Sequence, residues 1–91
     1  MTPRPDLPPT IPYVDRSDCV GTGPAVRLAR FRYDYRMGRT DTVRANGWTR
    51  SRAACGIITP EEADAQIAKN NAGEWRAYDA LMALQAELGV V

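Results

Sequence analysis

Prolines are confined almost entirely to one end of this chain: six of the seven lie within residues 1–24, and the seventh is Pro60. Because proline has a fixed φ and no backbone N–H, a segment this dense in proline cannot form a regular helix and favours the extended polyproline II conformation. The sequence therefore predicts an extended Pro-rich arm over residues 1–23 and a folded domain over residues 24–91. Since a Pro-rich terminus is seldom ordered unless it packs on something, we expect the arm to dock on its own domain or on a neighbouring chain.

The length of 91 residues is enough for one small domain. Domains of this size bury a modest fraction of their surface, so a large enclosed active-site cavity is not expected. The longest uncharged apolar run, residues 53–60, is far shorter than the roughly 20 residues that span a bilayer. The N-terminus has no basic region followed by an apolar stretch that would direct export. We therefore expect a cytoplasmic protein without a transmembrane segment.

The clearest helix start lies at Thr59-Pro60-Glu61-Glu62. A threonine at the N-cap, a proline at the first helical position and a glutamate at the third complete a capping box. We therefore expect a helix that begins at Pro60. Asparagines and a glycine within residues 70–73 predict an interruption, and a further helix then runs to Leu88, where Gly89 supplies a stop.

Residues 24–37 carry two conflicting patterns. Pro24 follows a Gly-Thr-Gly loop and Gly38 supplies a stop, which together predict a helix over residues 24–37. Against it, apolar residues alternate strictly with charged residues from Phe31 onward, which is the period-2 pattern of a half-buried strand. The helix is our leading interpretation, and a strand over residues 26–37 stays open.

Residues 38–59 indicate short pieces, with turns at 38–41 and 46–47 and two helical turns over 48–55 that end at Gly56. The sequence as a whole predicts a mainly α single domain, a small helical bundle of three to four helices with an extended Pro-rich N-terminal arm. If residues 26–37 form a strand, the class becomes α+β.

Charge is strongly asymmetric along the chain. Residues 24–52 hold eight of the twelve basic residues, all arginine, against two aspartates, whereas the helical part at residues 60–88 carries six acidic residues against two basic ones. Guanidinium groups bind phosphates and carboxylates bidentately and stack on rings. Because aromatic residues are interleaved with these arginines, the centre suits recognition of an anionic macromolecule. The predicted partner-binding residues are Arg27, Arg30, Arg32, Arg36, Arg39, Arg44, Arg50, Arg52, Tyr33, Tyr35 and Trp48.

Residues suited to catalysis are scarce. The chain has no histidine, and its serines and cysteines stand in no known nucleophile setting. A tetrahedral zinc site needs four good ligands, and no glycine-containing segment has the spacing of a phosphate-binding loop. We therefore expect no enzyme, no catalytic residue, no metal and no cofactor. Cys19 and Cys55 are interpreted as free thiols, because nothing in the sequence points to an oxidising compartment.

The leading functional hypothesis is a small non-enzymatic binding protein. Its size and lack of motifs are typical of proteins that phages and other mobile elements encode. It would act stoichiometrically on a larger protein or nucleoprotein complex, as an inhibitor or regulator of a host nucleic-acid-processing or defence system, or as an assembly subunit. Residues with rings and guanidinium groups dominate protein interfaces, which favours this interpretation.

Two alternatives remain. The arginines and rings would also suit direct nucleic-acid binding, although the helix expected at Pro60 presents acidic residues at the end that a helix-turn-helix protein inserts among the bases. A self-assembling structural subunit, or a homodimer, is the third hypothesis. The apolar stripe Ala77, Leu81, Leu84 and Leu88 is then either the core face of the last helix or the seam between two copies.

Overall fold

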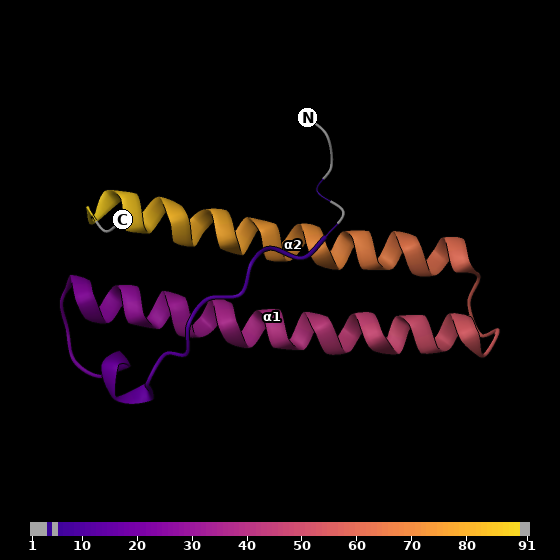
Figure 1. Cartoon of the computed structure of the whole chain (residues 1–91), viewed down its shortest axis with the longest axis horizontal. Helices are drawn as coiled ribbons and strands as arrows, with labels where there is room; N and C mark the ends of the chain where they lie inside the picture. The colour runs from indigo at the N-terminus through magenta and orange to yellow at the C-terminus, as the bar shows by residue number, and fades with distance from the viewer. Residues whose placement is uncertain (1–3, 5, 90–91) are drawn as a thin grey trace.

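The structure is a computed structural model that describes residue 4 and residues 6–89. It contains a short 3-10 helix, η1 (Arg16–Cys19), and two long helices, α1 (Pro24–Ala54) and α2 (Pro60–Glu87). The two long helices lie side by side and antiparallel, joined by a tight connection (Figure 1). The mainly α class is confirmed.

The predicted number of helices is wrong. The described residues form two long helices instead of three to four, and they contain no strand, so the α+β alternative for residues 26–37 is also wrong. α1 continues through residues 38–41 and 46–47, where turns were expected, and α2 continues through residues 70–73. The hairpin is therefore long and flat, with principal extents of 49 × 31 × 16 Å.

α1 continues through Gly38, where the sequence predicted a helix end. A glycine inside a helix costs about 1 kcal/mol relative to alanine. A Cβ atom at position 38 would lie 3.5 Å from Oε1 of Glu74, an ordinary van der Waals distance, so an alanine would fit here as well. Packing against α2, such as the Thr42–Glu74 hydrogen bond of 2.8 Å, stabilises the helix across this glycine.

The asparagines that resemble helix breakers pair with one another across the hairpin. The Asn46 amide of α1 donates to Oδ1 of Asn71 at 2.9 Å, and the Asn70 amide of α2 donates to Oδ1 of Asn46 at 3.1 Å. Asn46 and Asn71 are buried, with 2% and 4% of their surface exposed. Since buried polar groups need partners, this asparagine cluster of Asn46, Asn70 and Asn71 fixes the register of the two helices.

The predicted helix termini are confirmed where capping chemistry is strong. The Glu62 N–H donates to Oγ1 of Thr59, and the Thr59 N–H donates to Oε1 of Glu62, both at 3.1 Å. Gly56 and Gly89 have φ values of 74° and 71°, which favour glycine at the end of a helix. α1 begins at Pro24, as predicted, without a side-chain cap.

The apolar core is small and lies between the first half of α1 and the second half of α2. Leu28 and Tyr35 of α1 meet Leu81 and Leu84 of α2, and Leu81 is completely buried. The stripe on the last helix is therefore a core face, and a dimer seam through Leu81 and Leu84 is wrong. The partly buried residues packed on this cluster are Ile11, Tyr78, Met82 and Leu88.

The Pro-rich arm lies across the hairpin. Residues 6–14 run extended over one face of the molecule, first crossing α2 and then α1, before the chain enters η1 (Figure 1). Pro8, within this segment, is fully buried where the arm crosses the hairpin. Docking of the arm on its own domain is confirmed for the described residues. Within residue 4 and residues 6–89, no helix has an apolar stretch long enough to cross a membrane.

We expect Leu81→Ala to destabilise the protein by about 2–5 kcal/mol, because a completely buried leucine loses its contacts and leaves a cavity. Urea unfolding followed by far-UV circular dichroism measures this change. Ile57→Ala is the matched control, since Ile57 is 71% exposed and should change stability by less than about 0.5 kcal/mol. Equal losses in both variants would contradict a core centred on Leu81.

Candidate interaction surface

Part of the arginine set holds the arm. Arg39 donates from Nε to the carbonyl oxygen of Pro8 at 3.0 Å, and Arg36 donates to the carbonyl oxygen of Ile11. The hydroxyl of Tyr35 donates to the carbonyl oxygen of Pro9 at 2.5 Å. An extended Pro-rich segment has no internal hydrogen bonds. These three side chains of α1 supply the donors that its carbonyls need.

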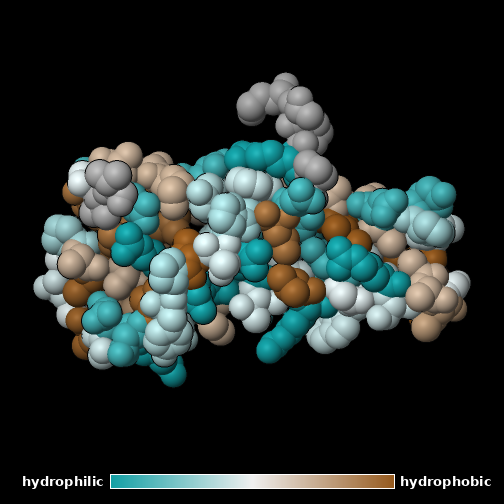
Figure 2. All heavy atoms as spheres, in the orientation of Figure 1, coloured by the Kyte–Doolittle hydropathy of each residue, from teal (hydrophilic) through white to brown (hydrophobic). Residues whose placement is uncertain are grey.

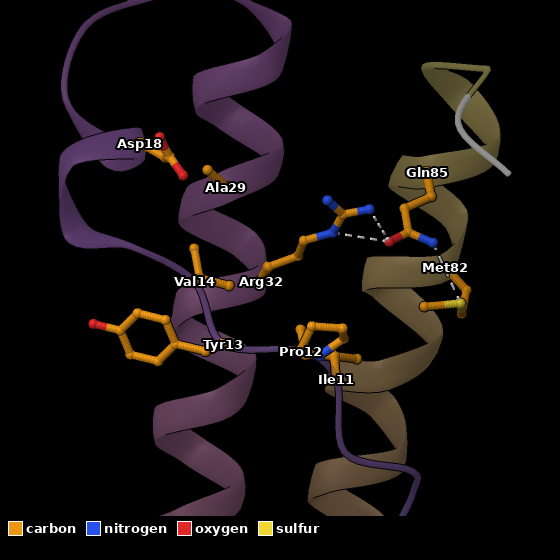
Figure 3. Close-up of a pocket in the computed structure, with 9 residues that line it drawn as sticks. All are labelled: Ile11, Pro12, Tyr13, Val14, Asp18, Ala29, Arg32, Met82 and Gln85. Atoms are coloured by element: carbon orange, nitrogen blue, oxygen red, sulfur yellow. Dashed lines mark hydrogen bonds between the residues drawn. The ribbon is translucent and has the colours of Figure 1, made fainter.

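Two more arginines fasten other parts of the chain to α1. Arg30 donates to the carbonyl oxygens of Cys19 and Gly21, at 2.8 and 3.2 Å, and so holds the loop that follows η1. Arg32 donates from two nitrogens to Oε1 of Gln85, at 3.2 and 2.9 Å, which joins α1 to α2 (Figure 3). Both guanidinium groups are therefore engaged inside the molecule.

Arg27 and Tyr33 have weaker internal roles. Nη1 of Arg27 lies 3.8 Å from Oε1 of Glu87, and both side chains are more than half exposed. An exposed pair of this kind contributes little stability. Tyr33 is half-buried and lines a hollow together with Cys19 of η1. Both side chains therefore remain at least partly accessible to solvent.

The arm contacts α2 through residues that were not predicted from the sequence. Nε1 of Trp75 donates to the carbonyl oxygen of Asp6 at 2.5 Å. The Arg4 guanidinium lies 4.1 Å from the centre of the Trp75 ring and forms an ion pair with Asp79 at 2.8 Å. Aromatic rings that carry N–H donors are typical receptors for polyproline II segments. That pairing of a Pro-rich arm with a tryptophan is the signal that would have identified Trp75.

The hollow beneath the arm is part of this docking arrangement. It has a volume of about 390 Å³ and lies between the arm and the two helices. In Figure 3 the Arg32–Gln85 hydrogen bonds span it, and the arm residues Ile11 to Val14 form its near wall. Figure 2 shows hydrophilic and hydrophobic residues intermixed over this arm-bearing face. The docked arm therefore creates this hollow by forming one of its walls.

The remaining arginines stand apart at the end of the hairpin near the connection. Arg44, Arg50 and Arg52 are exposed, and none of them has a hydrogen bond or ion pair with any residue that the structure describes. Trp48 is 71% exposed. Arg44, Trp48 and Arg52 are spaced four residues apart and form one stripe on α1, whereas Arg50 projects to another side. We call Arg44, Trp48, Arg50 and Arg52 the free cationic end.

A shallow hollow of about 280 Å³ adjoins the free cationic end. Trp48, Thr49 and Arg52 line it from α1, and Gln66 and Asn70 line it from α2. Its lining combines a guanidinium, amides and an indole, which are groups that recognise carboxylates, phosphates and flat rings. Cys55 lies just beyond this region, and neither it nor Cys19 forms a disulfide, in agreement with the expected free thiols.

Among the described residues, two ionisable groups have shifted pKa values. Burial raises the pKa of Tyr35, and the nearby Arg39 guanidinium partly opposes that rise. The backbone N–H of Ser17 donates to the Asp15 carboxylate at 2.9 Å and lowers the pKa of that exposed group. Both shifts follow from local hydrogen bonding and packing of the arm and its loop, away from the free cationic end.

The structure thus divides the predicted partner-binding residues. Arg30, Arg32, Arg36, Arg39 and Tyr35 form hydrogen bonds with other parts of the same chain. The free cationic end forms no hydrogen bond or ion pair within the described residues. Comparison with protein-family models, with curated proteins and with solved structures gives no match to this chain.

We expect Arg39→Ala to loosen the arm. The substitution removes a charge-assisted hydrogen bond worth about 1.5–3 kcal/mol, so the population with an undocked arm should rise roughly tenfold or more. Chymotryptic cleavage after Tyr13 measures this opening, since its side chain is 77% exposed. Arg44→Ala is the matched control, because it removes the same charge from the same helix without touching the arm. Equal cleavage of both variants would argue against the assigned clamp.

We expect alkaline pH to destabilise the protein partly through Tyr35. Its pKa is raised in the folded state, so the unfolded chain loses this proton first as pH rises. The contribution is fully present below about pH 10 and is lost as pH rises towards the folded-state pKa. Tyr35→Phe removes the ionisation and one hydrogen bond to the arm. The difference in free energy of unfolding between wild type and Tyr35→Phe should therefore decrease above about pH 10 in urea titrations. A difference that stays constant with pH would contradict a contribution from Tyr35 ionisation.

Proposed function

We propose that this chain is a non-enzymatic binding protein that acts stoichiometrically on a larger macromolecular assembly. The observation that supports this proposal is the division of the arginines. Those near the arm have internal partners, whereas Arg44, Arg50 and Arg52 surround an exposed Trp48 without any partner among the described residues. Three unpaired guanidinium groups beside an indole have no evident role in the stability of the monomer.

The chemistry of the free cationic end favours an acidic protein surface as its target. Tryptophan and arginine are the residue types that contribute most to interface hot spots. Arg44 and Arg52 lie eight residues apart on one helix, about 12 Å, with the indole between them. This spacing lets each guanidinium group meet its own carboxylate, one on either side of the ring. We further propose a cytoplasmic protein of a phage or mobile element that inhibits or regulates a host nucleic-acid-processing or defence complex, or serves as an assembly subunit.

Nucleic-acid binding is the second candidate, and the same stripe favours it. An exposed indole can stack on a base while the flanking guanidinium groups contact phosphates. The start of α2 is less suitable, because Glu61 and Glu62 are exposed there and would repel phosphate. Contact would therefore run along α1 and would be largely independent of sequence.

A tagged pull-down from native-host lysate, with and without nuclease, tests both candidates. We expect a discrete protein that survives nuclease with the wild type and is lost with Arg44→Glu/Arg52→Glu, because reversal repels an acidic partner. Arg76→Glu reverses an exposed charge on α2 and should leave capture unchanged. Recovery of nuclease-sensitive material alone would replace the first candidate with the second. Undiminished capture by Arg44→Glu/Arg52→Glu would refute the assigned surface.

A further inference from the structure

One face of α1 follows a heptad-like pattern that the monomer leaves uncovered. From Asp34 to Arg52 its residues recur with 4-3-4-3-4 spacing, so they share one side of the helix. Arg36, which holds the arm, is nine residues from Ala45 and therefore points to the opposite side, since successive residues turn by about 100°. We call this face the open seam; its residues are Asp34, Gly38, Asp41, Ala45, Trp48 and Arg52.

Two hollows along the open seam are lined only by residues of α1 and α2. Figure 1 shows the arm crossing the face of the hairpin that is turned to the viewer. Arg36, which holds the arm, lies on the side of α1 opposite the open seam. The hollow at Gly38 has a volume of about 230 Å³, with Phe31 at one side and Ala77 and Ala80 of α2 at the other. No other described segment enters it. The open seam thus carries two separate shallow hollows, one at Gly38 and one beside Trp48 and Arg52.

The flat shape of the molecule leaves this face open. The hairpin is 16 Å across its thinnest direction and exposes 6468 Å². A compact protein of 10.1 kDa exposes about 5,300 Å². The two helices therefore form a single layer, and the face with the open seam is not covered by the arm.

A single antiparallel register makes the open seam complementary to itself. Asp34 and Gly38 are four residues apart, and so are Trp48 and Arg52. When α1 pairs with α1 of a second copy about residue 43, Trp48 faces Gly38 of the second copy and Arg52 faces its Asp34. Two-fold symmetry repeats both contacts. The register thus gives two ion pairs and two indole-in-hollow contacts.

The hollow at Gly38 also offers the hydrogen-bond acceptor that a buried indole needs. Oε2 of Glu74 is buried and has no hydrogen-bond partner among the described residues. Glu74 is one of the residues that line this hollow. A tryptophan N–H usually finds an acceptor when it is buried. The indole N–H of Trp48 from a second copy would satisfy this orphan oxygen.

α2 has small residues at the level where the two-fold axis would pass. Contacts of Thr42 with Glu74 and of Asn46 with Asn71 place residue 43 opposite residues 73–74. Gly73 lies at this level, and Ala77 and Ala80 follow it on the same side of the hairpin. Their small side chains permit the second helices of two copies to approach as well, so four helices pack in one bundle.

We propose that the open seam binds a second copy of this chain, in a symmetric antiparallel dimer with Trp48 seated at Gly38 and Arg52 paired with Asp34. This inference narrows the proposed function, on which it rests: a second copy covers Trp48 and pairs with Arg52. Arg44 and Arg50 stay exposed beside the seam, so they are the residues of the free cationic end that the larger assembly would meet. The two Arg44 side chains flank the axis, which concentrates positive charge on one side of the dimer.

Charge reversal tests this register by sedimentation velocity over a concentration series. The wild type should sediment as a dimer at roughly 100 µM. Asp34→Arg and Arg52→Asp should each raise the dimer dissociation constant roughly tenfold or more, because each creates two like-charge contacts. The double variant Asp34→Arg/Arg52→Asp should recover to within about threefold of the wild type. Arg16→Asp, the matched control, reverses an exposed charge in η1 away from the seam and should leave the dimer dissociation constant unchanged.

Tryptophan emission provides a second measurement. The difference between the wild type and Trp48→Phe reports Trp48, and it should shift to shorter wavelength as the dimer forms. A monomeric wild type at the highest concentration, or a double variant no better than the single ones, would overturn the dimer. If Asp34→Arg is monomeric yet still captures the larger partner through Arg44, both proposals stand. A wild-type monomer with normal capture overturns the dimer alone, and a wild-type dimer without any capture overturns the proposed function alone.

Discussion

The rest of the structure depends on how an extended backbone obtains hydrogen bonds. A polyproline segment cannot satisfy its own carbonyls, so it can lie on a protein surface only where side chains supply donors. Tyr35, Arg36 and Arg39 supply them from α1, and Trp75 supplies one from α2. Because this arm bridges both helices, it adds contacts to a hairpin whose apolar core is small. It also determines which arginines are used internally.

The strong local signals in the sequence were sufficient for part of the fold. The capping box at Thr59, the proline at position 24 and the glycine at position 56 gave correct helix ends, because these ends are decided by neighbouring residues. Gly38 and Asn71 misled for the opposite reason. Each is unfavourable inside an isolated helix, and each lies within a long helix that packing between α1 and α2 stabilises, for example through the Asn46–Asn71 hydrogen bond. Intrinsic helix propensity depends on a residue and its neighbours in the chain, so it does not include such contacts between distant residues.

The candidate site was predictable in composition and unpredictable in arrangement. Arginine and aromatic residues mark the middle of the chain, but their roles differ with the side of α1 on which each one lies. Arg36 and Arg44 are alike in sequence context, yet one contacts the arm and the other contacts solvent. That difference can be predicted only when the path of the arm across the helices is known. Trp75 was missed because its role as an arm receptor exists only once the arm is placed.

The path of the arm has a consequence for the order of folding. The two helices are neighbours in the chain, so the hairpin can form from contacts of modest sequence separation. The contacts of Asp6 with Trp75 and of Arg4 with Asp79 join residues 69 and 75 positions apart. Closing such long loops is slow compared with local helix pairing. We therefore expect the contacts of the arm with α2 to form last, whereas its contacts with α1 join residues only 25–31 positions apart. Until the arm closes on α2, the Trp75 ring and the Asp79 carboxylate remain accessible to other chains.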